Sequence, residues 1–230
     1  MSSHHASDSQ QQDRPDVPSP RPSSVAAVVV TFHPEPDLTA KLASVLTQVG
    51  WIVVVDNGSC DADLPDCSEP TMRGRVEIIA NTENRGIGAA LNQGLRRAKE
   101  RGYDWALTLD QDSSPLPNLV EASGRAFLAY PKPERLAAIG ASFVGAEQPT
   151  PASAWAYRRL PAVITSGTLH SIPAWERLGG FRDDYFIDCV DTEFCLRRPG
   201  RDVLHEPLPA SDGLPVPDAG SWATASDRTA

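Results

Sequence analysis

The chain has 230 residues and a net charge of −9, from 21 Lys and Arg against 30 Asp and Glu. This length suits one domain with room for an appendage, and the negative charge disfavours nucleic acid and anionic lipid as partners. An anionic substrate would need a local source of positive charge, such as a bound cation. The four cysteines match no zinc pattern and no dense disulfide framework, which predicts reduced thiols and a cytoplasmic location.

Both ends of the chain differ in composition from its middle. Residues 1–24 are polar and lack the apolar centre of a signal peptide, so we expect a disordered tail there. From residue 199 to 230 prolines and small polar residues follow without periodicity, which predicts an irregular tail. No apolar run is long enough to span a membrane, so we expect any membrane association to be peripheral, at the inner face.

The region between these tails, 25–198, alternates apolar strands with amphipathic helices. The chain order of the predicted elements is strand 25–32, helix 36–50, strand 51–56, strand 76–81, helix 86–102, strand 105–112, helix 117–130, strand 136–144, strand 162–172, short helix 173–181 and a helix that begins in the acidic segment 188–193. The early strands are continuous apolar runs rich in β-branched residues, as in parallel sheets covered on both faces. The order predicts an α/β fold with a Rossmann-like, mostly parallel sheet flanked by helices.

Polar residues follow the predicted strands at their carboxyl ends. They are Thr31, the cluster 56–59, Asn84, and Asp110 with Asp112. Ligands of doubly wound sheets bind beyond this edge, so the convergence of polar residues predicts a site there.

Asp110 and Asp112 are separated by one residue at the end of a strand. On an extended segment both carboxylates would point to the same side. Two such charges would force one group to protonate unless a divalent cation compensates them. Oxygen ligands suit Mg²⁺ or Mn²⁺, with substrate phosphates completing the coordination. The alternative is an ordinary solvated turn, which the neighbouring polar clusters make the weaker interpretation.

The segment that contains Gly86 and Gly88 resembles a dinucleotide-binding fingerprint only in part. Leu91 occupies the third glycine position, and the segment follows the third strand instead of the first. A nicotinamide enzyme is therefore disfavoured. We expect the glycines to let the start of the helix approach a ligand, with Asn84 supplying hydrogen bonds.

Six segments in order carry a family resemblance: "VVVTFHP", "VVVDNGS", "NRGIGAALNQGL", "LTLDQDS", "ITSGTL" and "LGGFRDDYFIDCVDTEFCLR". Together they resemble the family 2 glycosyltransferases of GT-A fold, and most closely the rhamnosyltransferase branch, over about 25–197. The resemblance implies transfer of a sugar, with inversion, from a nucleoside diphosphate sugar such as dTDP-rhamnose or a UDP-sugar, using a divalent metal. The implied acceptor is a glycan or a lipid-linked glycan.

The resemblance also assigns donor-binding roles to individual residues. Thr31 and Phe32 match the position that meets the nucleoside, and Asp56, beside Asn57 and Ser59, matches the acid that contacts base or ribose. The remaining matches are Asn84 and Gly86 near the donor, Asp110 and Asp112 at the ribose and the metal-bound diphosphate, and Ser166 and Gly167 in the loop that lines the sugar pocket.

Asp191 matches the catalytic base of the family. Inverting displacement needs a carboxylate on the face opposite the leaving group to take the proton of the acceptor hydroxyl. Without the resemblance, the acids of 188–193 would be read as a helix start favoured by the helix dipole. Asp188 and Glu193 are structural or supporting candidates.

Several residues keep two interpretations open. His33, beside the expected nucleoside pocket, either contacts the nucleotide or has no role, and His170 is either structural or part of the sugar pocket. The aromatic residues Trp155, Tyr157 and Trp175 line an acceptor surface or belong to the core.

The chain departs from the family after Arg197, where relatives add a strand and then a late histidine that helps to hold the metal-bound diphosphate. In this chain His205 comes too early to match that histidine. One hypothesis is that a frameshift truncated the gene and replaced its natural end, because a shifted reading frame of the segment 202–213 can encode histidines shortly before a glycine. The alternative functions are a truncated, catalytically impaired remnant that still binds nucleotide sugar, and a nucleotidyltransferase. The segment 31–37 disfavours the latter, because it contains neither glycine nor lysine for a phosphate loop.

Overall fold

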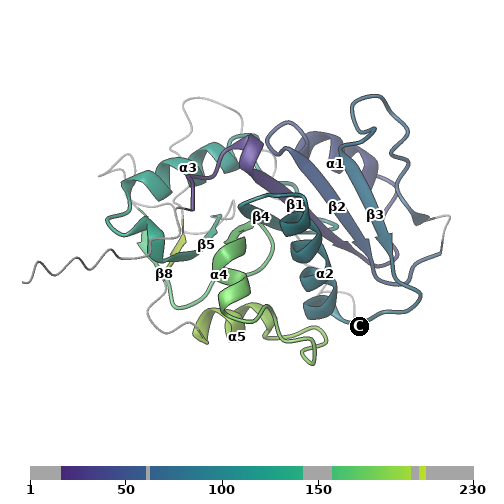
Figure 1. The fold of residues 1–230 in the computed structure, drawn as a ribbon. Helices are drawn as coiled ribbons and strands as arrows, with labels where there is room; N and C mark the ends of the chain where they lie inside the picture. The colour runs from purple at the N-terminus through teal and green to yellow at the C-terminus, as the bar shows by residue number, and fades with distance from the viewer. Residues whose placement is uncertain (1–16, 61–62, 142–156, 198–201, 206–230) are drawn as a thin grey trace, which may run out of the picture.

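The computed structural model describes residues 17–60, 63–141, 157–197 and 202–205, which form a sheet between two layers of helices (Figure 1). Its described strands are β1 Val25–Thr31, β2 Trp51–Asp56, β3 Val76–Ala80, β4 Trp105–Asp110, β5 Leu136–Gly140, β6 Arg158–Arg159, β7 Thr168–Ser171 and β8 Asp202–His205. The described α-helices are α1 Leu38–Val45, α2 Ile87–Glu100, α3 Leu119–Ala129, α4 Ile172–Arg177 and α5 Val190–Leu196. The short 3₁₀ turns η1 Pro22–Ser24 and η3 Pro133–Arg135 precede β1 and β5.

The strands form one sheet in the order β3-β2-β1-β4-β7-β5-β8-β6. Strands β1 to β4 pair in parallel, β7 runs antiparallel to β4 and β5, and β8 runs parallel to β5. The carboxyl ends of the parallel strands therefore meet at one edge, where Thr31 pairs with Asp56 and Val30 with Asp110. The predicted α/β fold with a mostly parallel sheet is confirmed.

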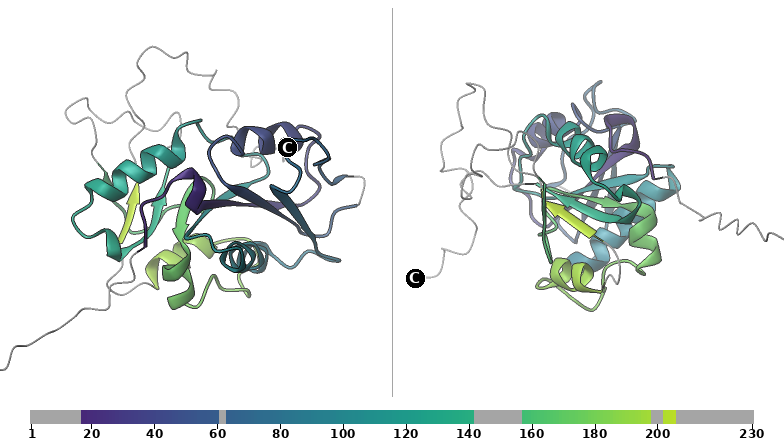
Figure 2. Two further views of the ribbon diagram at one scale, coloured as in Figure 1. Left: turned by 45° about the horizontal axis from the view of Figure 1, so that its top comes forward. Right: turned by 90° about the vertical axis from the view of Figure 1, so that its left-hand side faces the viewer.

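Alternate residues of the strands pack into two separate apolar layers. In β1, Val25, Ala27 and Val29 face α1 and α3, whereas Ala26, Val28 and Val30 face α2, α4 and α5. The left panel of Figure 2 shows the first pair of helices above the sheet and the other three below it. Burial on both faces explains why these strands are apolar without interruption, since each large apolar side chain removed from water contributes about 1.5–3 kcal/mol.

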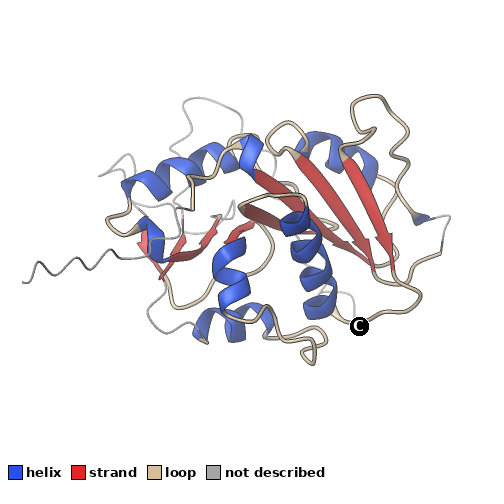
Figure 3. Cartoon of the chain, in the orientation of Figure 1, coloured by secondary structure: helices blue, strands red, loops and turns tan. Residues whose placement is uncertain are grey.

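Several strands, shown in Figure 3, are shorter than predicted, and two of these differences concern residues of the candidate site. The strand expected at 162–172 comprises only Thr168–Ser171, because a turn precedes it: Gly167 has φ 74° and Thr168 N–H donates to the Thr165 carbonyl at 3.2 Å. Strand β4 ends at Asp110 instead of residue 112. No helix within the described ranges is long and apolar enough to cross a membrane.

The expected N-terminal tail is too long by eight residues. Trp105 Nε1 donates to the Pro18 carbonyl at 2.8 Å, and Ser19 Oγ donates to the Gly124 carbonyl at 3.3 Å. Val17 packs against the layer that contains α3. Disorder through residue 24 was therefore a wrong prediction for residues 17–24, while 1–16 lie outside the described residues.

The expected irregular C-terminal tail contains a strand. Strand β8 lies between β5 and β6, with Val203 and Leu204 buried in opposite layers of the core. The strand that was expected to be missing after Arg197 is therefore present. Val203 and Leu204 fit the two layers of the core, which argues against replacement of the natural sequence at these positions by a frameshift. The rest of 199–230 lies outside the described residues.

Two glycines let α2 lie close to its neighbours. A Cβ on Gly94 would come within 2.2 Å of Val28 Cγ1 in β1, and a Cβ on Gly88 within 2.4 Å of the Arg182 carbonyl oxygen. Contacts this short do not occur between real side chains and backbone, so both positions require glycine at the observed helix position.

We expect Gly94→Ala to destabilise the protein by about 2 kcal/mol, because the added methyl group forces α2 away from β1. Urea unfolding of Gly94→Ala, Val28→Ala and the double variant measures this effect. Removing the clashing methyl groups of Val28 should make the double variant less destabilised than the sum of the two single changes. Strictly additive losses would contradict a clash between these two residues.

The buried carboxylate of Asp202, 2% exposed, anchors β8. It forms an ion pair with Arg159, and its other oxygen lies 3.4 Å from Arg135 Nε. We expect Asp202→Asn to cost about 2 kcal/mol, because the buried carboxylate is the partner of both Arg159 and Arg135 and an amide does not replace its charge. Asp37→Asn is the matched control, because Asp37 is exposed and its pair with Lys41 should contribute about 0.5 kcal/mol or less. Equal unfolding free energies for the two variants would show that Asp202 does not hold β8.

Candidate functional site

Three carboxylates approach one another at the carboxyl edge of the sheet. Asp110 ends β4, Asp112 follows in a turn closed by Ser113 N–H donating to the Asp110 carbonyl at 3.0 Å, and Asp191 lies in the first turn of α5. Burial of the carboxyl among its neighbours, together with the charges of Asp112 and Asp191, raises the pKa of Asp110 to about 6, although the residue keeps an exposed surface. This repulsion marks the place where a cation would be favoured.

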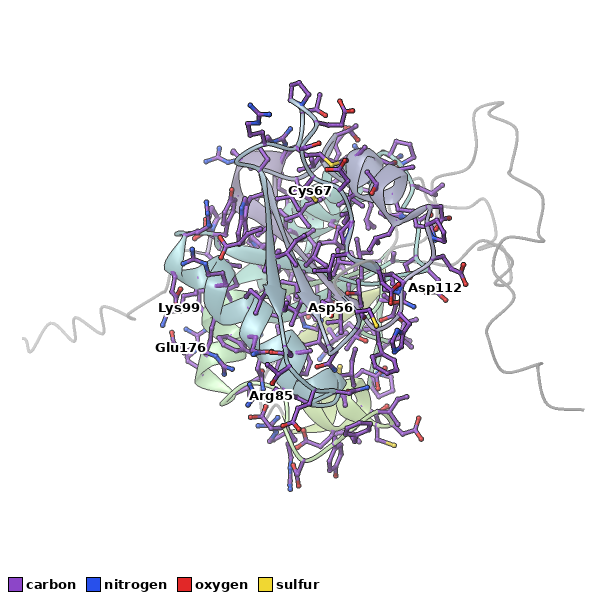
Figure 4. All side chains as sticks on the ribbon, turned by 90° about the vertical axis from the view of Figure 1, so that its right-hand side faces the viewer. Asp56, Cys67, Arg85, Lys99, Asp112 and Glu176 are labelled. Carbon is purple, nitrogen blue, oxygen red and sulfur yellow. The ribbon has the colours of Figure 1, made fainter. Side chains whose placement is uncertain are left out.

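The sequence predicted that strand alternation points Asp110 and Asp112 to the same side. This argument does not apply, because β4 ends at Asp110 and Asp112 lies in the turn that follows. Gln111 instead turns back, and its Oε1 accepts a hydrogen bond from Phe32 N–H at 2.8 Å. Figure 4, which looks onto the β3 edge of the sheet, labels Asp112 and Asp56. Within the described residues, no group of three or more His, Cys, Asp or Glu side chains is placed to hold a metal ion. Asp110 and Asp112 remain the two candidate ligands.

Asp56 joins the ends of β1 and β2. It is 1% exposed, and its Oδ1 accepts hydrogen bonds from Thr31 Oγ1 at 2.9 Å and Ser59 Oγ at 2.6 Å. Its Oδ2 accepts from the backbone N–H groups of Gly58 at 3.2 Å and Ser59 at 2.8 Å. A carboxylate has about four lone-pair positions, so these four bonds use its acceptor capacity. Asp56 and Thr31, both expected to meet the nucleoside, are bonded to each other.

Asn57 connects this turn to the start of α2. Its Nδ2 donates to Asn84 Oδ1 at 2.8 Å and to the Gly86 carbonyl at 3.3 Å. Its Oδ1 accepts from Asn81 Nδ2 at 3.1 Å and Arg85 N–H at 3.0 Å. Asn57 and Asn84 are therefore brought together as expected, in a network that fixes the loop before α2.

The neighbour of Gly86 and Gly88 is another segment of the same chain. A Cβ on Gly86, which has φ 81°, would lie 2.9 Å from Phe186 Cα, and Ile87 N–H donates to the Phe186 carbonyl at 2.7 Å. The Gly86 N–H donates to Asn84 Oδ1 at 2.9 Å. The close approach that these glycines allow is that of residues 182–186, and the expected approach of a ligand to the start of α2 stays a prediction.

Ser166 and Gly167 lie beside Asp110, as expected for residues that share a site. Ser166 Oγ accepts from Asp110 N–H at 3.2 Å and is hydrogen-bonded to Ser113 Oγ. Gly167 N–H donates to the Thr108 carbonyl at 2.9 Å. The loop before β7 is thus fastened to the end of β4.

Asp191 has one oxygen bonded and one available. Its Oδ1 accepts from Thr192 N–H at 2.6 Å and Thr192 Oγ1 at 3.3 Å, and its Oδ2 accepts no hydrogen bond from the described residues. Glu193 forms an ion pair with Arg197, whose Nε lies 2.7 Å from Oε1, and its Oε2 accepts a hydrogen bond from Arg197 Nη2 at 2.9 Å, which favours the structural interpretation. Asp188 is exposed before the helix.

The other residues with two interpretations belong to the core. Tyr157 packs edge-on against Tyr130 with ring centroids 5.1 Å apart, and Trp175 Nε1 donates to Asn92 Oδ1 at 3.0 Å. His170 lies between Phe181 and Phe194, and burial lowers its pKa to about 3, so the ring is neutral. Trp155 lies outside the described residues.

Sequence reasoning missed three residues at this edge: Gln111, Ser113 and Asp63. The side chains of Gln111 and Ser113 contact β1 and the loop before β7, respectively. Asp63 Oδ2 lies 3.1 Å from His33 Nδ1, which gives His33 a partner. The position of Gln111 between two candidate aspartates was a usable signal, whereas nothing in the sequence linked Asp63 to His33.

A cavity of about 840 Å³ lies elsewhere, between α2, α4 and residues 179–184. Its charged groups are largely paired within the chain, including Lys99 with Glu176 and Arg182 with Asp184. Figure 4 shows Lys99 and Glu176 together, apart from Asp56 and Asp112. None of the three carboxylates lines this cavity.

One curated protein is similar to the chain over most of its length. It is the dTDP-rhamnosyl transferase RfbF of Shigella flexneri, which is 28% identical over 207 residues, covering 81% of this chain and 67% of that protein.

Solved structures share the fold at low identity. The crystal structure of S. aureus TarS 1–349 has a TM-score of 0.55 at 15% identity, and GalNAc-T7 with UDP, GalNAc and Mn²⁺ has a TM-score of 0.59 at 14% identity. The matches cover 79% and 80% of this chain but only 57% and 42% of those proteins. The family model of glycosyl transferase family 2 matches residues 26–161, more than half of the sequence, and the chain therefore belongs to this family.

Proposed function

We propose that the chain transfers a sugar, with inversion, from a nucleoside diphosphate sugar to a hydroxyl group of a glycan or lipid-linked glycan. The observation that carries this proposal is the approach of Asp110, Asp112 and Asp191 at the carboxyl edge of the sheet, where burial, together with the charges of the other two carboxylates, raises the pKa of Asp110 to about 6. A carboxyl group whose pKa is raised by burial and by neighbouring charges is typical of catalytic sites. Membership in glycosyl transferase family 2 supports the reaction class.

The donor set fits a divalent cation of the hard, oxygen-preferring kind. Asp110 and Asp112 offer only carboxylate oxygens, and no cationic side chain in the described residues pairs with either of them. When bound there, Mg²⁺ or Mn²⁺ would neutralise charge that develops on the departing diphosphate. The bound cation would also attract an anionic donor to a chain whose net charge is −9.

Asp191 is the proposed general base. The free Oδ2 takes the proton of the acceptor hydroxyl while the acceptor oxygen bonds to the anomeric carbon. The bond from that carbon to the diphosphate oxygen breaks, and the electron pair leaves with the nucleoside diphosphate. Thr192, which donates two hydrogen bonds to Oδ1, keeps the carboxylate oriented.

We propose rhamnose as the sugar, carried by dTDP, with a UDP-sugar as the alternative donor. The similarity to a dTDP-rhamnosyl transferase supports the first, and the fold shared with TarS, solved with UDP and with UDP-GlcNAc, supports the second. With a surface glycan as the acceptor, the proposed role is in polysaccharide or cell-wall synthesis.

Calorimetric titration of dTDP and UDP, with and without Mn²⁺, tests the donor site. We expect binding that needs Mn²⁺ and is lost in Asp112→Ala, because one of two metal ligands is removed. Glu100→Ala, which removes a carboxylate at the far end of α2, is the matched control and should bind like the wild type.

Release of dTDP from dTDP-rhamnose in the presence of acceptor tests the chemistry. Asp191→Asn should bind donor normally but lose turnover by about a hundredfold or more, since the general base is removed. Binding without turnover in the wild type would identify a nucleotide-sugar-binding remnant. A folded wild type that binds neither nucleotide would exclude the proposed donor site.

The raised pKa of Asp110 also predicts a cost in stability. Its pKa in the folded chain lies above that of an unfolded aspartate, about 3.9, so the folded state binds more protons between about pH 4 and 6. Stability from this group is therefore present at low pH and lost as pH rises through 6. Asp110→Asn should melt at a higher temperature than the wild type at pH 7.5, and the difference should shrink at pH 4.5.

Added Mn²⁺ should reverse that order at pH 7.5, because it stabilises the wild type but not Asp110→Asn. Thermal melts with and without the ion measure both effects, and Glu100→Gln controls for the loss of one charge. An Asn variant no more stable than the wild type at pH 7.5 would refute unfavourable charge at Asp110.

A further inference from the structure

The turn that carries Asp110 and Asp112 is held by its neighbours although it lies beyond the end of β4. The loop before β7 bonds both ends of the turn: Ser166 Oγ accepts a hydrogen bond from Asp110 N–H at 3.2 Å and is hydrogen-bonded to Ser113 Oγ. The Ser113 N–H closes the turn by donating to the Asp110 carbonyl at 3.0 Å. Residues 111 and 112 lie between these two fixed ends.

The side chain of Gln111 holds the middle of the turn from the side of β1. Strand pairing between β1 and β4 ends at Val30 and Asp110, so no strand partner holds residue 111. The Phe32 N–H, just past the end of β1, donates to Gln111 Oε1 at 2.8 Å. A backbone N–H only donates, so the facing atom of the amide must be its oxygen. The Gln111 side chain thereby takes the role that a backbone carbonyl of the partner strand has within the sheet.

The backbone of Gln111 is bonded to a third element. Lys41 Nζ, from α1, donates to the Gln111 carbonyl at 3.5 Å. Gln111 itself is half-buried. This one residue therefore connects the turn to β1 through its side chain and to α1 through its backbone.

The carboxylates of Asp110 and Asp112 are free where the rest of the turn is bonded. Within the described residues, neither carboxylate accepts a hydrogen bond or forms an ion pair. Two like charges repel, so a turn that could open would let them move apart. Ligands of one cation must be held against this repulsion, and in metal sites hydrogen-bonded neighbours orient the ligands.

We infer that Gln111 is a positioning residue of the candidate metal site: its bond to Phe32 holds the turn so that Asp110 and Asp112 stay within reach of one divalent cation before any nucleotide binds. This inference rests on the proposed donor site and adds a residue that acts through the two aspartates. The alternative is that Gln111 serves only the stability of the fold. Affinity for Mn²⁺, compared with thermal stability, separates the two roles.

Titration of Mn²⁺ alone, followed by the electron paramagnetic resonance signal of the free ion, measures the positioning without nucleotide or turnover. Gln111→Met keeps the length of the side chain but removes the acceptor of the Phe32 N–H. We expect this variant to bind Mn²⁺ about tenfold more weakly than the wild type, the effect of one lost hydrogen bond. Gln111→Asn, one methylene shorter, also loses the bond and should give the same loss.

Gln111→Glu keeps the acceptor and is the conservative variant. It should bind Mn²⁺ at least as tightly as the wild type, because it retains the bond and adds a negative charge near the cation. Hydrogen exchange of the Phe32 amide shows in each variant whether the bond is present. We expect exchange about tenfold faster in Gln111→Met and Gln111→Asn, and the wild-type rate in Gln111→Glu.

Gln93→Met is the matched control for the loss of an amide bond elsewhere. Gln93, in α2, exchanges two hydrogen bonds of 2.9 Å with the side chain of Asn81. Neither of these residues contacts the turn 110–113 through a hydrogen bond. We expect this variant to bind Mn²⁺ like the wild type.

The outcomes distinguish this inference from the proposed function. Wild-type affinity for Mn²⁺ in Gln111→Met and Gln111→Asn, with fast exchange of the Phe32 amide, would overturn the positioning role while the donor site stands. An equal loss of affinity in Gln93→Met would do the same. A wild type that binds Mn²⁺ only together with UDP would also overturn it, because the ligands would not be held in place before the nucleotide. A folded wild type that binds neither Mn²⁺ nor nucleotide would overturn the donor site as well. Melting temperatures close to that of the wild type show that the effects are not losses of folding.

Discussion

The carboxylate of Asp56 organises the edge at which the candidate site lies. Its four hydrogen bonds join the last residue of β1 to the turn after β2, and Ser59 extends the connection to the backbone of His33. A buried carboxylate is tolerated only when its oxygens are bonded, and here Thr31 of β1 and the turn residues Gly58 and Ser59 supply the donors. These bonds make Asp56 the residue that fixes the relative position of the ends of β1 and β2.

The opposite condition holds at Asp110, whose side chain accepts no hydrogen bond from the described residues and faces two like charges. In the folded chain without a bound cation, the charged carboxylate of Asp110 is therefore unfavourable, and only a cation or a proton relieves the repulsion. The fold can carry this cost because β4 is buried from Trp105 to Leu109 and its end is fastened to Ser166. The buried part of the strand supplies stability, and the unfavourable charge is limited to its last residue and to the turn that follows.

The sequence predicted the fold well because strand burial leaves a local pattern: apolar β-branched runs and helical leucine spacing are visible within ten residues. It predicted the polar edge of the sheet for the same reason, because the polar residues directly follow the apolar runs in the sequence. It failed where partners are distant or geometry is irregular. The contact of Gly88 with Arg182 spans 94 positions, the pairing of His33 with Asp63 crosses a loop without pattern, and β8 is too short to show a period. The alternation argument for Asp112 failed because β4 ends two residues earlier.

Helix α2 links the two halves of the candidate site. At its N-terminus, the carbonyl of Gly86 accepts a hydrogen bond from Asn57. In its middle, Asn92 donates to the Phe181 carbonyl and to Asp183, in the segment that leads to Asp191. Gly86 and Gly88 allow that segment to lie against the helix, and Ile87 N–H fixes it at Phe186. The segment that leads to Asp191, the proposed general base, therefore packs against the same helix that is bonded to the Asn57 network. The glycines that resemble a nucleotide fingerprint act in this structure by letting residues 182–186 lie against the start of α2.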